Sequence, residues 1–222
     1  MDAAGGQVQG ARKRQEDAYA IERTRDGGCL ALVADGLGGH PGGDVASREA
    51  VAEFLRVFRE TEAKAEHSPR EWLKLALLAA DEHLRRRQKA EPALAGMSTT
   101  LVALFVKGRE AYALSVGDSY LFVLRDGVLE RVNELHRLGP ALTSTVGFHL
   151  DRVEASGMLA VVDRDRYLLA SDGMATLDEG EIRQLLAPAP NAAAAVRELL
   201  RAIGKKAAPR QDNATVVALF PG

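Results

Sequence analysis

The sequence predicts an α+β domain in which antiparallel sheets are covered on the outside by helices. Two observations predict this class: short apolar runs joined by tight turns fill the middle of the chain, and amphipathic helical patterns lie before and after them. Asp126-Gly127 between two apolar runs is a hairpin signal. Strands that follow one another through hairpins favour antiparallel sheets over a parallel one.

The strands are predicted from runs of apolar residues. Residues 29–34 are apolar without interruption, which is typical of a strand that is covered on both faces. The other predicted strands are residues 8–12, 18–23, 99–106, 111–116, 120–124, 128–132, 167–171 and 214–220.

Four helices are predicted, and two of them begin at a capping box. In this pattern a small polar side chain and a Glu three residues later satisfy free backbone amides. The two pairs are Ser68 with Glu71 and Asp178 with Glu181. Asp44 and Asn191 are expected to cap the other two helices, and Gly204 is placed to end the last one.

The composition fits one domain over residues 1–222, since a chain of this length buries a sizeable core. The formal net charge of −2 gives no strong field towards nucleic acid or a membrane surface. No apolar stretch reaches the roughly 20 residues of a membrane helix. The single cysteine, Cys29, excludes an intrachain disulfide and a cysteine-based zinc site. We therefore expect a cytoplasmic protein with neither nucleic acid nor membrane as a partner.

Acidic residues stand at the ends of the predicted core strands. They are Glu16 and Asp17, Asp35, Asp118, Asp172 and Asp212. Any one of them has a simpler explanation as a turn residue, a helix cap or a buried acid paired with a base. Taken together, they would repel one another if the sheets brought the strand ends to one place, and they would need a shared cation. Carboxylate oxygens select hard ions such as Mg²⁺ or Mn²⁺.

Two such ions can activate a water molecule for attack on phosphorus, so that no protein nucleophile is required. The sequence fits that absence, because it contains neither a Cys-x5-Arg loop nor a G-x-S-x-G elbow. A phosphate-binding G-x-x-x-x-G-K-S/T loop is missing as well, which argues against an NTPase.

Six short motifs occur in a fixed order along nearly the whole chain. They are RKRQEDA at residues 12–18, VADGLGGH at 33–40, GMSTT at 96–100, SVGDS at 115–119, SDG at 171–173 and DNAT at 212–215. In this order and spacing they resemble the motifs of the type 2C metal-dependent protein serine/threonine phosphatases, in their bacterial form. The resemblance implies a four-layer αββα sandwich of two antiparallel sheets flanked by helix pairs. It also implies hydrolysis of phosphoserine and phosphothreonine by a metal-bridged water.

The resemblance further assigns roles to individual residues. Two Mg²⁺ or Mn²⁺ ions would be bridged by Asp35, with the carbonyl of Gly36 as a further ligand. Asp172 and Asp212 would complete one ion, and Glu16 and Asp17 would serve the second. Asp118 would hold a third, weaker ion together with Asp172. Arg12 would bind the substrate phosphate through two donors, and Asp35 and Arg12 would be the central catalytic residues.

The partners implied by the resemblance are phosphoproteins, including a Ser/Thr kinase and its substrates. A second hypothesis is a phosphatase-fold protein that binds phosphoproteins or regulators with little catalysis. It is favoured by Gln15 in place of the motif's Asn, by Tyr120 in place of an Arg, and by a shortened flap. A third hypothesis, a metal-dependent nuclease, lacks the signal of a basic groove.

The flap is the largest departure from the family pattern. Residues 133–151 stand where bacterial relatives usually carry a longer insertion, so we expect a more open site whose substrates are chosen by partner docking. Leu37 stands where animal members carry a His. His40 lies nearby and is expected to be structural or at the surface, and the other histidines are expected to be ordinary surface or helix residues.

Overall fold

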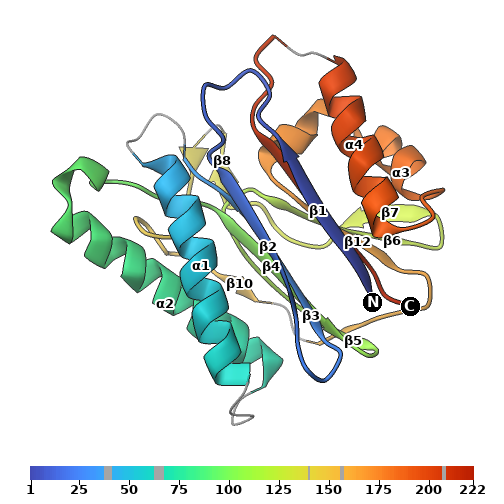
Figure 1. Ribbon diagram of the computed structural model, residues 1–222, viewed down its shortest axis with the longest axis horizontal. Coiled ribbons are helices and arrows are strands. Elements are labelled where there is room, and N and C mark those ends of the chain that lie inside the picture. The colour runs from blue at the N-terminus through green and yellow to red at the C-terminus, as the bar shows by residue number, and fades with distance from the viewer. Residues whose placement is uncertain (38–41, 63–67, 140, 156–157, 207–208) are drawn as a thin grey trace.

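The computed structural model describes residues 1–37, 42–62, 68–139, 141–155, 158–206 and 209–222. The chain forms four layers, with two sheets in the middle and a pair of helices on each outer face (Figure 1). The predicted αββα arrangement is therefore confirmed. His40 and His67, and the end of the VADGLGGH motif, lie outside the described residues.

Each sheet is antiparallel throughout. The first has the order β1 (Asp2–Val8), β13 (Ala214–Phe220), β12 (Arg166–Ala170), β6 (Tyr120–Arg125) and β7 (Val128–Arg131). The second has the order β10 (Glu154–Ala155), β5 (Glu110–Val116), β4 (Leu101–Lys107), β3 (Cys29–Asp35) and β2 (Asp17–Arg23), and β11 (Leu159–Ala160) also pairs with β5. A small separate hairpin joins β8 (Arg137–Leu138) to β9 (Ala141–Leu142).

The helices cover the outer faces of the sheets. Helices α1 (Gly43–Glu62) and α2 (Pro69–Ala90) pack on the second sheet, and α3 (Glu179–Leu186) and α4 (Ala192–Lys206) pack on the first. Two short 3₁₀ turns complete the chain, η1 (Pro92–Leu94) and η2 (Asp172–Thr176). Within the described ranges, no helix is both long and apolar enough to cross a membrane.

Three apolar clusters fill the spaces between the four layers. Strand β3 shows how the middle is built: Leu30 and Leu32 face helices α1 and α2, whereas Ala31 and Val33 face the other sheet. Opposite faces of one strand therefore lie in two different cores, which explains the uninterrupted apolar run in the sequence. Ala and Val side chains together with several Leu and one Tyr fill the space between the sheets.

Both predicted capping boxes are present at the starts of α2 and α3. The Asn191 side chain accepts a hydrogen bond from Ala194 N at 2.8 Å, as predicted for the cap of α4. The expectation that Gly204 ends this helix is wrong, because α4 continues to Lys206. A glycine within the last turn weakens a helix but does not have to end it when the apolar face remains packed.

The prediction of a strand over residues 8–12 is also wrong. The strand is Asp2–Val8, and a loop follows it. Gly5 and Gly6 in DAAGGQV weaken the strand signal in the sequence, yet they are required by packing. A Cβ atom on Gly5 would lie 2.4 Å from Tyr19 Cε2, so only a residue without a side chain allows β1 to lie against this ring.

Candidate metal centre

A cavity of about 650 Å³ opens where the ends of strands from both sheets meet. Asp35 ends β3, Asp118 lies in the turn between β5 and β6, and Asp172 begins η2 directly after β12. Of the residues assigned to the site from the sequence, those that line this cavity are Arg12, Glu16, Asp35, Gly36, Asp118, Asp172 and Asp212. Side chains from five separate stretches of sequence are thus brought to one place.

Asp17 is the assigned residue that does not line the cavity. It pairs with Asp35 in the β2–β3 ladder and lies buried behind it. One of its oxygens, Oδ2, accepts hydrogen bonds from Ser171 Oγ at 2.8 Å and Thr215 Oγ1 at 2.7 Å. The other, Oδ1, is buried and has no hydrogen-bond partner among the residues that the structure describes. A carboxylate oxygen left in this way fits a bound cation or its water shell.

The negative charge at the centre of the site is not compensated. Burial, together with repulsion from Asp17 and Asp172, raises the pKa of Asp35 well above its ordinary value. Burial also raises the pKa of Asp17 to about 6. For Asp172, burial is again the main cause of a raised pKa, followed by repulsion from Asp118 and Asp212. Ionisation of these acids at neutral pH therefore destabilises the folded chain, and a divalent cation would relieve that cost.

No three acidic, imidazole or thiol side chains of the described residues are already grouped as a ready metal-binding cluster. The carboxylates instead surround a wide cavity, and two of them, Asp118 and Asp212, are each paired with a basic side chain. Their chemistry nevertheless suits Mg²⁺ or Mn²⁺, since all are hard oxygen donors and one buried oxygen lacks a partner. The residues present therefore fit such ions, provided that the carboxylates move towards them on binding.

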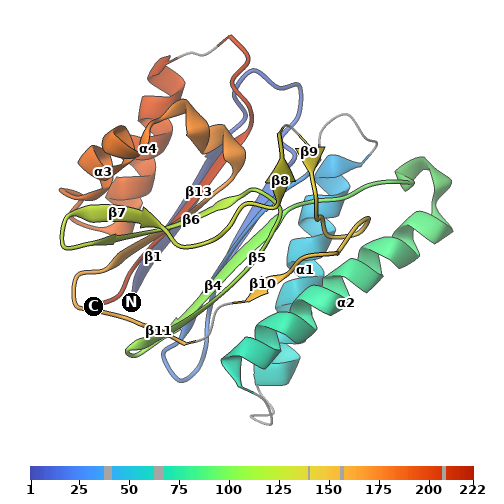
Figure 2. The ribbon, with the colours of Figure 1, turned by 180° about the vertical axis from the view of Figure 1, so that it is seen from behind.

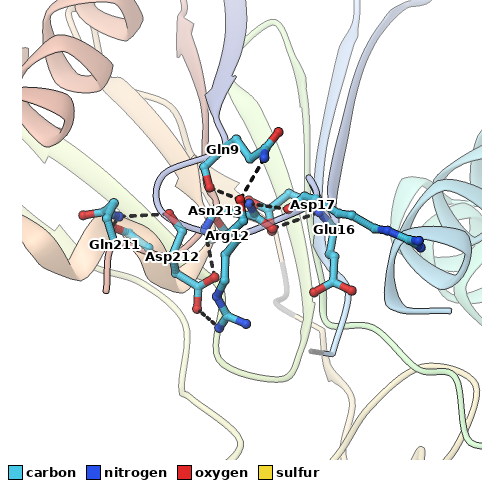
Figure 3. A network of polar contacts seen from close by, with 10 residues as sticks. Gln9, Arg12, Glu16, Asp17, Gln211, Asp212 and Asn213 are labelled. Atoms are coloured by element: carbon cyan, nitrogen blue, oxygen red, sulfur yellow. Dashed lines mark hydrogen bonds and ion pairs between the residues drawn. The ribbon is translucent and has the colours of Figure 1, made fainter. Parts of the chain in front are cut away.

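Arg12 lies in the loop between β1 and β2, where its Nη2 donates to Asp212 Oδ2 at 2.5 Å. Figure 3 shows the Glu16 carboxylate directed to the same side as this ion pair. The Arg12 side chain is 46% exposed, so its guanidinium remains accessible from the cavity. Arg12 is thus placed at the acids, with one of its donors engaged by the carboxylate of Asp212.

Asn213 fixes this loop to the start of β13, and sequence reasoning did not assign it a role. Its Nδ2 donates to the carbonyls of Gln9 and Arg14 at 2.8 and 2.9 Å, and its Oδ1 accepts from Glu16 N at 2.9 Å (Figure 3). Gln15, which departs from the family motif, accepts from Asp17 N at 3.0 Å. The neutral residues beside the acids therefore set the position of the acids.

The same principle explains the GMSTT motif and the SDG glycine. Thr100 Oγ1 accepts from Asp35 N at 3.0 Å, and Thr99 Oγ1 donates to Asp35 O at 2.8 Å. A Cβ atom on Gly173 would lie 2.0 Å from Asn213 O, so η2 lies directly against the chain that enters β13. The supporting roles of Thr99, Thr100 and Gly173 could have been predicted from their positions within the motifs, where each stands next to or opposite an acid.

One of the described histidines differs from the sequence expectation. His136 is not a surface residue: it is 5% exposed, and its Nδ1 accepts from Gly117 N at 3.3 Å. Burial lowers its pKa. His149 lies on the cavity wall and pairs with Asp151 at 2.8 Å. Tyr120, which stands where the family motif has Arg, stacks on Phe122 and does not line the cavity.

Comparison with known proteins identifies the family. The family described as protein phosphatase 2C matches residues 5–215, which is nearly the whole chain. The chain belongs to this family. The serine/threonine phosphatase stp of Listeria monocytogenes is 33% identical over 135 residues, which cover 60% of this chain and 54% of the relative. The match thus spans only about half the length of that curated relative.

Solved structures with the same fold include serine/threonine phosphatases. PppA, described as a key regulatory component of T6SS in Pseudomonas aeruginosa, is 31% identical, with a TM-score of 0.80 over 99% of this chain and 97% of PppA. The catalytic domain of the serine/threonine protein phosphatase PstP, solved in complex with two manganese ions, is 24% identical. Its TM-score is 0.81 over 99% of this chain and 98% of that domain, which shows a shared fold.

Cation binding should stabilise the folded chain. A ligand at 100 times its Kd contributes about 2.7 kcal/mol, which corresponds to a rise in Tm of about 5–10 °C for a chain of this size. We expect Mn²⁺ to produce such a rise in a thermal unfolding scan at neutral pH. Asp172→Asn should unfold at a similar or higher temperature without metal, because repulsion is relieved, and should lose most of the shift. Equal shifts in both proteins would contradict this account.

Asn213→Ala should lower the free energy of unfolding by roughly 2–4 kcal/mol, since buried polar groups left without partners cost about 1–3 kcal/mol each. Denaturant titration measures this value. Gln9→Ala in the same loop is the matched control, because Gln9 is exposed and its side chain donates to the nearby Arg12 O. Its effect should stay within about 0.5 kcal/mol. A cost for Asn213→Ala as small as that of the control would show that Asn213 does not fix the loop.

Proposed function

We propose that this chain is a Mg²⁺- or Mn²⁺-dependent phosphatase that hydrolyses phosphoserine and phosphothreonine in proteins, with residues 1–222 acting as one catalytic domain. The observation that carries the proposal is the gathering of Asp35, Asp172 and Asp212 with Arg12 in one cavity. Membership of the protein phosphatase 2C family supports the same activity. A phosphoprotein of a Ser/Thr kinase pathway is the proposed partner, and a reducing cytoplasm the proposed compartment.

The acids would hold the cations in the roles that the family resemblance assigns. Glu16, Asp35, Gly36, Asp172 and Asp212 all line the cavity, and the buried Asp17 pairs with Asp35 in the β2–β3 ladder. Divalent ions held there would neutralise phosphate charge and activate a water molecule for attack on phosphorus. Thr99 and Thr100 hold the backbone of Asp35, so that this residue keeps its position.

Arg12 is suited to bind the substrate phosphate. Its guanidinium has several donors, only one of which is used by Asp212 in an ion pair, and the side chain is half exposed. A phosphate group carries more charge than one carboxylate and accepts two parallel hydrogen bonds from a guanidinium. Arg12 can therefore orient the phosphate at the acids without leaving the loop that Asn213 fixes.

The remaining wall of the cavity fits a protein substrate. Leu37, Leu142 and Phe148 lie on this wall, and the Phe148 side chain is largely exposed, at 63% for the residue. Phe148 and Leu142 belong to the short flap, so this segment still contributes to the site. An apolar surface beside a charged pocket would contact the residues next to the phosphorylated one. The shortened flap was expected to leave the choice of substrate to partner docking. We propose instead that Phe148 and Leu142 of the flap also contact the substrate and assist that docking.

Activity on p-nitrophenyl phosphate tests the proposed reaction. Purified protein should hydrolyse this substrate with Mn²⁺, and EDTA should abolish turnover. Asp172→Ala should lower kcat by roughly 100-fold or more, the scale for loss of one charge-stabilising group. Asp163→Asn is the matched control, since Asp163 is exposed and pairs with Arg109 at the surface. Turnover that survives chelation would exclude the mechanism. Metal binding without turnover would favour the regulatory, non-catalytic hypothesis.

Substrate preference tests the apolar wall. The two substrates are phosphothreonine peptides with either Leu or Gly next to the phosphorylated residue, and the wild type should prefer the Leu peptide. Phe148→Ala should reduce this preference by about 5- to 10-fold, as expected for about 1–1.4 kcal/mol of lost apolar contact. The measurement is kcat/KM for the two peptides. Leu138→Ala is the control, because Leu138 is an apolar flap residue that is 78% exposed and does not line the cavity. Equal preference in wild type and Phe148→Ala would contradict this role.

A further inference from the structure

Asp118 differs from the other acids of the cavity in its basic neighbour. This neighbour, Arg137, lies outside the cavity lining, whereas Arg12, the partner of Asp212, lines the cavity. The Asp118 carboxylate faces the cavity, and its charge contributes to the raised pKa of Asp172, so both acids belong to one electrostatic site. Arg137 Nη1 lies 3.6 Å from Asp118 Oδ2. The Asp118 side chain is 12% exposed and that of Arg137 41%, so this pair is partly shielded from water.

The position of Arg137 is restrained by hydrogen bonds of the neighbouring His136 and of the Arg137 side chain. His136 N donates to Gly117 O at 2.8 Å, and His136 Nδ1 accepts from Gly117 N at 3.3 Å. The residue before Arg137 is therefore bonded twice to the residue before Asp118. Arg137 Nε also donates to Gly139 O at 3.1 Å, which restrains its side chain. Arg137 begins the β8–β9 hairpin, which lies at the same end of the molecule as the β1–β2 loop (Figure 2).

The acids of the site are thus compensated unequally. In the part of the chain that the structure describes, Asp35 and Asp172 form no ion pair with a basic side chain, and Asp212 pairs with the accessible Arg12. Asp118 instead faces a guanidinium whose sequence neighbour, His136, is hydrogen-bonded twice to Gly117 beside Asp118. A divalent cation gains most where negative charge is uncompensated, and a fixed positive charge beside Asp118 repels it.

We propose that Arg137 is a built-in counter-ion for Asp118 and takes the place of a third divalent ion. The chain then binds one ion fewer than the resemblance to other family members implies, and Asp118 is held by the hairpin instead of by metal. Tyr120 stands where the family's G-D-S-R motif has Arg, and Arg137 supplies a guanidinium to Asp118 from another segment. The inference rests on one part of the proposed function, namely that the remaining acids of the cavity bind divalent cations.

The number of Mn²⁺ ions bound per chain tests this inference without any assay of activity. Free Mn²⁺ is followed by electron paramagnetic resonance during titration of the whole protein. Arg137→Gln should bind one ion more than the wild type, with lower affinity than the others. Arg137→Lys should keep the wild-type number, and Arg137→Gln combined with Asp118→Asn should return to it. Arg109→Gln is the control, because Arg109 forms an exposed ion pair far from the acids of the cavity.

Equal ion counts for wild type and Arg137→Gln, with both proteins folded by circular dichroism, would overturn the inference. The inference would also be overturned if the single substitution Asp118→Asn lowered the number of bound ions by one relative to the wild type. These failures differ from that of the proposed function, in which the wild type binds no Mn²⁺ at all. If Arg137→Gln does not fold, Arg137→Lys and Asp118→Asn still decide the question: both must keep the wild-type count.

Discussion

The central constraint on this molecule is the repulsion among carboxylates that are held together without enough positive charge to balance them. Asp35, Asp17 and Asp172 are enclosed by protein, and their raised pKa values express the cost of that arrangement. Such a cluster cannot be maintained by the acids themselves. It requires a rigid frame, and the rest of the structure can be understood as that frame.

The frame consists of neutral donors and acceptors on strands of both sheets. Ser171 on one sheet and Asp17 on the other meet through a hydrogen bond, and Thr215 joins them from β13. Hydroxyl groups are suited to this task because they orient a carboxylate without cancelling its charge. Ion pairs in the same positions would stabilise the apo protein and remove the field that attracts a cation. The stacked sheets therefore serve to bring uncharged donors to the acids from two directions.

Much of this arrangement could be predicted from the sequence, because its main signals are local. Apolar runs that end in an acid predicted both the strands and the acids that now line the cavity, and the capping boxes predicted the starts of α2 and α3. What could not be predicted depends on contacts between distant segments. The hydrogen bonds of Asn213, the burial of His136 and the approach of Arg137 to Asp118 all join residues that no local pattern relates. The strand at 2–8 was missed for the same reason, since Gly5 makes room for a ring on another strand and Gly6 for side chains of helix α4.

The contact between Gly173 and Asn213 has a consequence for the spacing of the site. With 2.0 Å between the place of a Cβ atom and Asn213 O, the turn after Asp172 and the residue after Asp212 touch through their backbones. The distance between these two acids is thus set by main-chain contact, and a single added methyl group would increase it while leaving every charge in place. A substitution at Gly173 would therefore change the distance between the negative charges without changing their number. Substituting an acid itself usually changes both.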